Sequence, residues 1–133
     1  MRGQRQALGP RQRGQDGEDA ACERLRRAGL RVLRRNYRVR GGEVDIVALD
    51  GEVLVFVEVR CRRYADWGGA AASVDARKRA RIVLAARHYL ACADARPEQP
   101  ACRFDVVAID GARLRWIRDA FDAPGRVRPG WRG

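Results

Sequence analysis

The chain has few of the residues that enzymes and metal-binding domains most often use. Its 133 residues include one histidine and one methionine, and aromatic residues make up 7%. The histidine, His88, has no Cys, Ser or acidic partner at a recognisable spacing, so a histidine-based catalytic site is not predicted. We expect His88 to be a surface residue.

The cysteines and the apolar residues exclude further classes of protein. Four cysteines form no CxxC pair and no Cys/His ligand spacing, which argues against a zinc site and a disulfide framework. There is no long apolar run and no recognisable signal peptide, so neither a membrane span nor export is predicted. We expect a cytoplasmic protein with free thiols, no membrane partner and no internal repeats.

Positive charge, by contrast, is abundant. The chain has 28 Lys and Arg residues against 17 Asp and Glu residues, with a formal net charge of +11. This balance favours a polyanionic partner, most often nucleic acid. Every cation except Lys78 is an arginine, whose planar fork suits phosphate. A bias towards arginine and alanine also arises from coding composition, so we give it little weight.

The length fits one domain with a core of its own. Residues 1–14 have almost no apolar content and are predicted to form a disordered basic arm. Residues 15–122 are predicted to form the folded domain, and residues 123–133 a flexible basic tail. Within the domain, the loop 64–73 carries Trp67, which we expect either to contact substrate or to pack back onto the domain.

The folded part predicts a helix, three strands, a second helix and two more strands. The first helix is expected over 15–28 and the second over 74–93, the latter capped by Ser73 or Asp75. The strands are expected at 30–39, in two segments within 42–60, at 103–109 and at 114–117. This order predicts an α/β fold with one mixed sheet flanked by helices.

The segment from Gly42 to Arg60 is the most informative part of the chain. It predicts a β-hairpin with a two-residue turn at Asp50-Gly51, which would place Asp45 opposite Phe56. Side chains alternate along each strand. One face is therefore expected to carry Glu43, Asp45, Phe56, Glu58 and Arg60, and the other Val44, Ile46, Val53, Val55, Val57 and Val59.

Two acids, Asp45 and Glu58, interrupt these apolar strands. A carboxylate in such a strand is costly to bury without a partner, and a divalent cation can partner both. In the expected register their Cα atoms are diagonal neighbours about 7–8 Å apart. They are therefore candidate ligands of one metal ion. The alternative is a pair of surface acids, but the apolar residues on both sides of Glu58 favour a sheet covered on both faces.

A third acid, Glu18, lies on the apolar stripe of the first helix with Ala21, Cys22 and Leu25. It is expected to point at the sheet, where it could join Asp45 and Glu58. The alternative is an acid in the first turn that favours the helix dipole.

In the second helix, the N-terminal half is strongly basic, which opposes the dipole. Phosphate binding would explain this charge, and a solvated basic face is the alternative.

These motifs resemble a known signature. Glu18 on a helix, then Asp45, then Glu58-Val59-Arg60 on the adjacent strand is similar to the PD-(D/E)xK nuclease signature. Across about residues 10–122, the chain resembles the YraN family of small bacterial proteins. The segments that carry this resemblance are Gly14-Gln15-Asp16-Gly17-Glu18, Asn36-Tyr37-Arg38, Gly42-Glu43-Val44-Asp45, Val55-Phe56-Val57-Glu58-Val59-Arg60, Lys78 with Arg81-Ile82, and Arg103-Phe104-Asp105-Val106-Val107.

The resemblance implies a restriction-endonuclease-like core, similar to Holliday-junction resolvases. It implies that Asp45 and Glu58 bind Mg²⁺ or Mn²⁺, with Glu18 assisting. Arg60 stands where the signature usually has lysine. An arginine stays protonated and cannot act as a base, but it can orient water and stabilise charge on a phosphate. The expected catalytic set is therefore Glu18, Asp45, Glu58 and Arg60.

The expected function is that of a metal-dependent endonuclease acting on structured or branched DNA. The alternatives are a non-catalytic nucleic-acid-binding module on the same fold, and a scaffold for an acidic protein. A homodimer is expected only by analogy with resolvase-like folds. Phosphate contacts, which hold a backbone without reading sequence, are expected from Arg38, Arg40, Arg62, Arg77, Lys78 and Arg81.

Overall fold

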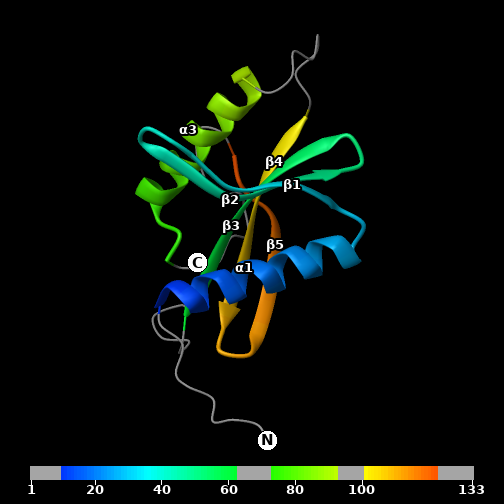
Figure 1. Cartoon of the computed structure of the whole chain (residues 1–133). Helices are drawn as coiled ribbons and strands as arrows, with labels where there is room; N and C mark the ends of the chain where they lie inside the picture. The colour runs from blue at the N-terminus through cyan, green and yellow to red at the C-terminus, as the bar shows by residue number, and fades with distance from the viewer. Residues whose placement is uncertain (1–9, 63–72, 93–100, 123–133) are drawn as a thin grey trace, which may run out of the picture.

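The computed structural model describes residues 10–62, 73–92 and 101–122 (Figure 1). Within these residues it has two helices and five strands. Their bounds are α1 Pro10–Arg27, β1 Arg31–Val39, β2 Gly42–Asp50, β3 Val53–Arg62, α3 Ala76–Cys92, β4 Cys102–Asp110 and β5 Arg113–Phe121. The expected order of elements and the α/β class are confirmed. The loop carrying Trp67 and the C-terminal tail lie outside the described residues.

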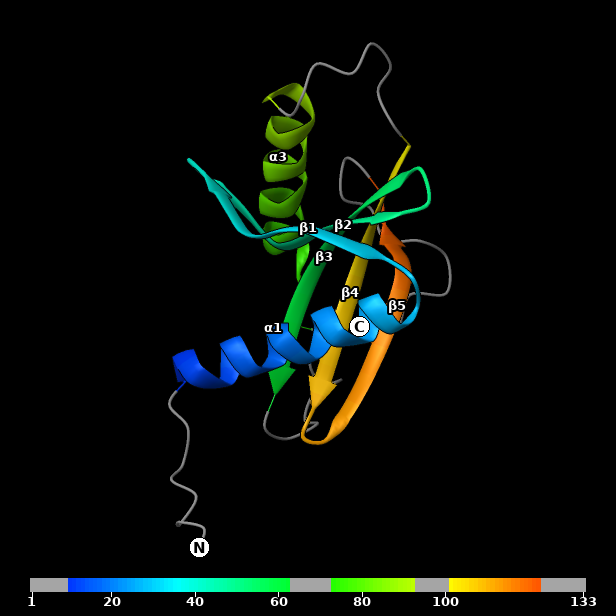
Figure 2. The ribbon, with the colours of Figure 1, turned by 45° about the vertical axis from the view of Figure 1, so that its right-hand side comes forward.

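The five strands form one mixed sheet in the order β1-β2-β3-β4-β5. All neighbours are antiparallel except β3 and β4, which are parallel. A parallel pair needs a crossover connection, and α3 lies in that connection. Helix α1 covers one face of the sheet and α3 the other (Figures 1 and 2).

Each helix buries the apolar stripe expected of it. Ala21, Cys22 and Leu25 of α1 are fully buried in one core cluster with strand residues. Ile82 and Ala85 of α3 are buried in a second cluster on the opposite face, which also contains three stacked phenylalanines. The sheet is therefore covered on both sides, as the apolar runs in its central strands predict.

The helix ends differ in part from expectation. Helix α1 begins at Pro10, so residues 10–14, expected in the disordered arm, belong to the helix, while residues 1–9 lie outside the described part. Helix α3 is capped by Asp75, whose Oδ1 accepts a 2.9 Å hydrogen bond from the backbone N of Lys78. Of the two expected caps, Asp75 is the one that the structure shows in this role.

The predicted register of the β2–β3 hairpin is wrong. Asp50 pairs with Val53 and Ile46 with Val57, so the turn lies at Gly51-Glu52 and Asp45 does not face Phe56. Gly51 has a φ of 60°, and a positive φ at the first turn position suits a type II′ turn. Asp50 stays in the ladder because its Oδ2 accepts a 2.9 Å hydrogen bond from Arg103 of β4.

The β2–β3 ladder ends at Ile46 and Val57, and the first part of β2 leaves β3 there. Val44 packs in the α3-side cluster and Ile46 in the α1-side cluster, so the predicted common face of these two residues is wrong. Beyond the ladder, β2 runs against α3. A Cβ on Gly42 would meet the backbone O of Arg81 at 2.7 Å, so only glycine permits this close approach.

Both outer strand pairs are irregular. The register of β1 against β2 shifts between Val32 and Arg34. The register of β4 against β5 shifts between Phe104 and Val106, opposite Asp119, which has a φ of 52°. Strand β5 extends to Phe121, four residues beyond the predicted end, because this bulge lets it continue along β4.

Candidate active site

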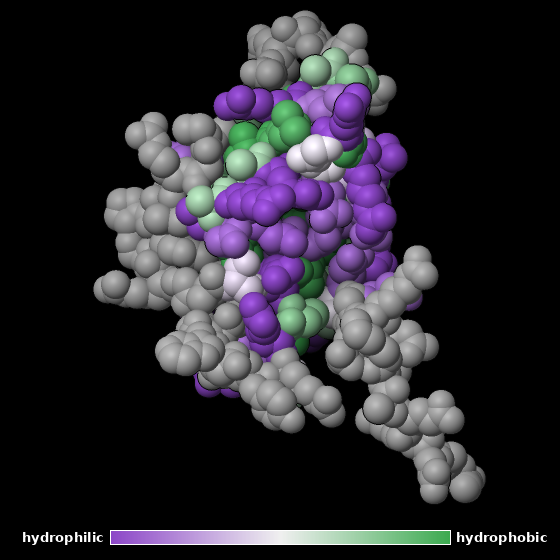
Figure 3. All heavy atoms as spheres, turned by 90° about the vertical axis from the view of Figure 1, so that its left-hand side faces the viewer, coloured by the Kyte–Doolittle hydropathy of each residue, from purple (hydrophilic) through white to green (hydrophobic). Residues whose placement is uncertain are grey.

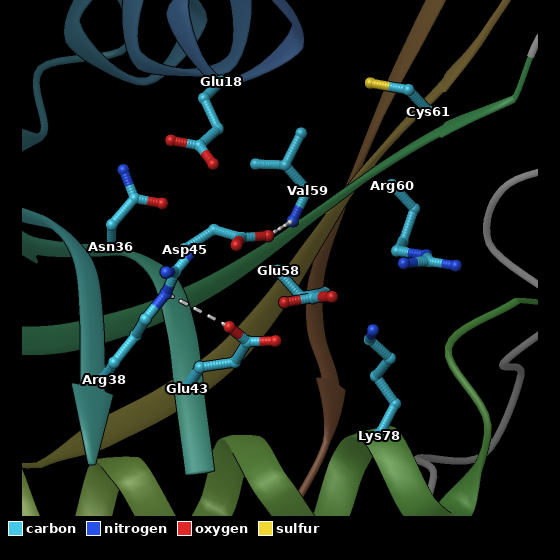
Figure 4. Close-up of a pocket in the computed structure, with 10 residues that line it drawn as sticks. All are labelled: Glu18, Asn36, Arg38, Glu43, Asp45, Glu58, Val59, Arg60, Cys61 and Lys78. Carbon is cyan, nitrogen blue, oxygen red and sulfur yellow. Dashed lines mark hydrogen bonds and ion pairs between the residues drawn. The ribbon is translucent and has the colours of Figure 1, made fainter. Parts of the chain in front are cut away.

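A polar cavity of about 370 Å³ lies where β2 leaves β3. Side chains from α1, β1, β2, β3 and α3 point into it (Figure 4). The lining residues are Glu18, Asn36, Arg38, Glu43, Asp45, Glu58, Val59, Arg60, Cys61 and Lys78. The structure therefore brings together all four expected catalytic residues and two of the six expected phosphate contacts.

Asp45 bridges the gap between the two diverging strands. Its Oδ2 accepts a 2.8 Å hydrogen bond from the backbone N of Val59, a donor just past the last β2–β3 pair. Burial raises the pKa of the Asp45 carboxyl, and the hydrogen bond from Val59 opposes that rise. The Asp45 carboxylate thus accepts the hydrogen bond that a backbone carbonyl of β2 would accept if the ladder continued, and it still faces the cavity.

Glu58 is the most deeply buried acid of the cavity, with 3% of its surface exposed. Burial and the neighbouring Asp45 carboxylate together raise the pKa of Glu58 to about 9. Near neutral pH, Glu58 is therefore expected to hold a proton unless a bound cation takes its place. Two acids held in this way provide a place for one added positive charge.

Glu18 reaches the same cavity from the sheet-facing side of α1. Its Oε1 accepts a 3.3 Å hydrogen bond from Arg35. Burial and the Asp45 carboxylate raise the pKa of Glu18, while Arg35 and Asn36 lower it. Because α1 begins at Pro10, Glu18 is not in the first turn, and the helix-dipole alternative is wrong.

Of the three acids Glu18, Asp45 and Glu58, only two are placed to bind one metal ion together. Among the residues that the structure describes, no group of three His, Cys, Asp or Glu side chains is placed to hold a metal ion. Asp45 and Glu58 alone suit Mg²⁺, which binds through one or two carboxylates plus water and substrate phosphates. Glu18 is instead engaged by Arg35. The metal-binding role of all three residues stays a prediction.

Two cations face the carboxylate pair from different elements. Lys78 extends from the first turn of α3 towards Glu58 (Figure 4), and its charge lowers the pKa of both Asp45 and Glu58. Arg60 also lines the cavity, but its Nε donates a 2.8 Å hydrogen bond to Ser73 Oγ, close before α3. No local sequence pattern predicted that Lys78 reaches the acids.

The other expected phosphate contacts are spread around the cavity. Two of them form ion pairs with Glu43 at the rim. Arg38 Nε lies 3.4 Å and Arg81 Nη2 3.8 Å from the carboxylate oxygens of Glu43. Both arginines are exposed. Arg81 does not itself line the cavity, and neither do three further exposed arginines, Arg40, Arg62 and Arg77.

Sequence reasoning assigned no role in the site to four lining residues, Asn36, Glu43, Val59 and Cys61. Asn36 has a φ of 55° inside β1, a conformation that asparagine tolerates better than most residues, and it faces Glu18. The signal for Asn36 was present in the Asn36-Tyr37-Arg38 motif, but nothing in it specified the conformation. Cys61 packs its Sγ directly against Gly17 of α1.

The motif around Asp105 has a different role from the cavity. Asp105 is fully buried and accepts hydrogen bonds from Arg103 Nε (3.1 Å), Trp116 Nε1 (2.9 Å) and the backbone N of Asp119 (2.9 Å). These bonds hold the β4–β5 bulge together. Asp105 is therefore a structural residue of the fold.

The described surface in Figure 3 is mostly hydrophilic, with small hydrophobic areas. Leu84, at 46%, is the exposed large hydrophobic residue of the described part. Neither helix has the length and apolar character that a bilayer span needs in the described ranges. Such a surface suits a charged partner better than an apolar one.

Comparisons with known proteins give one consistent result. The model of the uncharacterised protein family UPF0102 matches residues 17–109. A UPF0102 protein from Dechloromonas aromatica (strain RCB) is 56% identical over 111 residues, which cover 84% of this chain and 89% of the relative. A UPF0102 protein from Pseudomonas aeruginosa (strain LESB58) is 50% identical over 119 residues, covering 85% and 94%. One from Cupriavidus taiwanensis is 55% identical over 113 residues, covering 84% and 83%. The matched range contains every residue that lines the cavity.

Proposed function

The chain belongs to the uncharacterised protein family UPF0102, and from the chemistry of its cavity we propose that it is a nucleic-acid-binding protein with a metal-dependent endonuclease site. The resemblance to the YraN family is thereby confirmed, while the nuclease activity is our proposal. The observation that carries it is a pair of neighbouring carboxylates, the half-buried Asp45 and the buried Glu58, inside a polar cavity with arginines in its lining and at its rim. The proposed substrate is DNA with branched or otherwise structured regions.

The carboxylate pair supports a metal ion because burial without a cation is costly. Burial and the neighbouring Asp45 carboxylate raise the pKa of Glu58, so two negative charges side by side are disfavoured there. Asp45 and Glu58 would hold Mg²⁺ or Mn²⁺, an ion that polarises a phosphate and lowers the pKa of a bound water. Glu18 would assist from α1, through water, because its carboxylate is held by Arg35.

The residues around the cavity support a nucleic-acid backbone as the ligand. Among the described residues that line the cavity none is aromatic, so these residues offer phosphate contacts and not a platform for stacking a base. Arg38 and Arg81 at the rim are paired only through Glu43 among the ion pairs of the described residues, and exposed ion pairs of this kind are weak. They can therefore exchange Glu43 for phosphate. The preference for branched DNA rests on the resemblance to resolvase-like nucleases.

The second candidate is a non-catalytic binding module on the same fold. It is favoured by the arginine at position 60 and by the engagement of Glu18 with Arg35, which leaves two carboxylates for a metal. In this case the basic surface binds nucleic acid, and the cavity does not cut it.

A cleavage panel separates the two candidates. The purified full chain is incubated with single-stranded, duplex, flapped and four-way DNA, and with RNA, in MgCl₂, MnCl₂ or EDTA. We expect cleavage that needs the metal and is lost in Asp45→Asn, while Asp45→Asn still binds the substrate. If the parent binds every substrate in a salt-sensitive way but cuts none, the binding module is the function. If it does not bind either, both candidates fail.

A further inference from the structure

We propose that Lys78, and not Arg60, is the cation that contacts the reacting phosphate, and that Arg60 is a positioning residue that holds the start of α3 through Ser73. The inference rests on the proposed function, since it assigns the contact between that site and its substrate. It revises the role that the nuclease signature implies for position 60.

The composition of the chain singles out Lys78. Of the 28 Lys and Arg residues, this is the one lysine. This lysine lines the same cavity as the carboxylates of Asp45 and Glu58. A lysine carries a compact charge with three rotatable donors, whereas a guanidinium is a wide, rigid plane.

The start of α3 fixes the position of Lys78. Asp75 caps the helix by accepting a hydrogen bond from the backbone N of Lys78 at 2.9 Å. Gly42 of β2 packs against the backbone of α3 around Arg81, so the same helix is held close to the strand that carries Asp45. From there the Lys78 side chain, half-buried, points at the carboxylate pair (Figure 4).

Arg60 is held in a different way. Its Nε donates a 2.8 Å hydrogen bond to Ser73 Oγ, which ties the end of β3 to the residues just before α3. A guanidinium that is held by a hydrogen bond from one of its donors is less free to move towards a substrate phosphate. The bond instead places the first turn of α3, and with it Lys78, relative to Glu58.

A phosphate that reaches Asp45 and Glu58 with a metal ion therefore meets Lys78 from the α3 side. The ammonium group donates hydrogen bonds to a non-bridging phosphate oxygen and balances the charge that develops there. Its part is electrostatic and needs no loss of its proton.

The test uses the fact that Lys78 is the one lysine of the chain. N-hydroxysuccinimidyl acetate then reacts with Lys78 and the terminal amine, and peptide mass spectrometry measures each rate. An Arg87→Lys variant adds an exposed lysine on the same helix as an internal reference. We expect saturating four-way or single-stranded DNA to slow acetylation of Lys78 about tenfold or more, the effect of a contact near 1.4 kcal/mol, and to leave the reference lysine unchanged. Equal rates at Lys78 with and without DNA would overturn the proposal.

Variants test the roles separately. Lys78→Ala is expected to lower kcat about 100-fold or more, the usual loss on removing a donor to a developing charge, and Lys78→Arg to restore little of it. Arg87→Gln, on the same helix and exposed, is the matched control with unchanged kcat. If Lys78→Ala cleaves as well as the parent, Lys78 is not the contact.

A Ser73 variant tests the role of Arg60. If Arg60 acts through that hydrogen bond, Ser73→Ala reproduces the loss seen in Arg60→Ala, the double variant is no worse than either, and acetylation of Lys78 changes rate in both. Arg60→Lys, which supplies the lysine of the nuclease signature, is then expected to lower activity. If Ser73→Ala is silent while Arg60→Ala is inactive, Arg60 contacts the phosphate itself and the proposal is wrong.

Failure of this inference is distinguishable from failure of the proposed function. If the parent chain cuts no substrate but DNA still protects Lys78 from acetylation, endonuclease activity is rejected and the phosphate contact stands. If the parent cuts and Lys78 is not protected, the activity stands and the contact is rejected.

Discussion

The backbone N of Val59 donates a 2.8 Å hydrogen bond to Oδ2 of Asp45, at the point where the β2–β3 ladder ends. A buried backbone donor without a partner costs about 1–3 kcal/mol. Asp45 therefore has two tasks: it satisfies the edge of the separating strand, and it lines the cavity beside Glu58. The geometry of the site and the integrity of the sheet are linked through this one side chain.

Two substitutions at Asp45 separate these tasks. Asp45→Asn keeps an oxygen acceptor for Val59, so we expect a free energy of unfolding close to that of the parent. Asp45→Ala leaves the Val59 donor unpaired and should lower the free energy of unfolding by about 1–3 kcal/mol. Urea denaturation near pH 6 measures both. Equal stabilities of the two variants would show that the hydrogen bond does not support the sheet.

Glu58 predicts an unusual dependence of stability on pH. Its pKa is raised to about 9 in the folded protein from an ordinary 4.5, so between these values the folded state holds a proton that the unfolded state has released. The contribution of Glu58 is therefore fully present below about pH 4.5 and is lost as the pH rises towards 9. A metal ion takes the place of that proton, so Mg²⁺ should stabilise the fold most at high pH.

Thermal midpoints measured near pH 6 and near pH 9, each in EDTA and in MgCl₂, test this expectation. Glu58→Gln is the matched control, because its amide does not titrate. We expect a smaller fall in midpoint between the two pH values for Glu58→Gln than for the parent, and no gain from MgCl₂. A parent protein whose response to Mg²⁺ is independent of pH would contradict the assignment.

Arg38 tests whether the rim of the cavity binds phosphate. Arg38→Gln should weaken DNA binding about equally for different sequences and reduce the slope of log affinity against log salt by about one. Fluorescence anisotropy over a series of salt concentrations measures that slope. Arg87→Gln on the outer part of α3 should leave it unchanged. The same slope for Arg38→Gln and the parent would place the phosphate contacts elsewhere.

Asp105 is predicted to matter for folding alone. Asp105→Ala leaves three donors without their acceptor in a fully buried place and should lower the free energy of unfolding by about 3–5 kcal/mol. Chemical denaturation measures the loss, and Glu52→Gln in the exposed hairpin turn should stay within about 0.5 kcal/mol of the parent. A folded Asp105→Ala protein that binds DNA normally supports the separation of this residue from the site.

The sequence was sufficient to predict the hairpin and to identify Asp45 and Glu58, because carboxylates inside apolar strands stand out at short range. The position of the turn was not predictable in this way. Asp50 is kept in the ladder by Arg103, 53 positions further along the chain, and a partner at that distance overrides the local preference of Asp-Gly. The register error was two residues, and within the ladder an even shift keeps each side chain on its face.

That Lys78 approaches the carboxylates of Asp45 and Glu58 was equally unpredictable from the sequence. The spacing of Lys78, four residues before the buried Ile82, indicates only its direction. Its distance from the acids depends on how closely α3 approaches β2, which is set by the missing side chain at Gly42. For Glu18, the helical stripe predicted the direction correctly. The competing interpretation failed because the helix starts further upstream than the apolar pattern does.

The irregular outer strands have a consequence for assembly. Within the described residues, β1 and β5 are the two edges of the sheet. Both carry a register shift and several exposed arginines, among them Arg31, Arg34, Arg113 and Arg118. Bulges and like charges are the means by which sheet edges resist pairing with another strand. Two copies of this chain are therefore poorly suited to merge their sheets into one. A homodimer, which stays a prediction, would therefore have to form through surfaces other than these two strand edges.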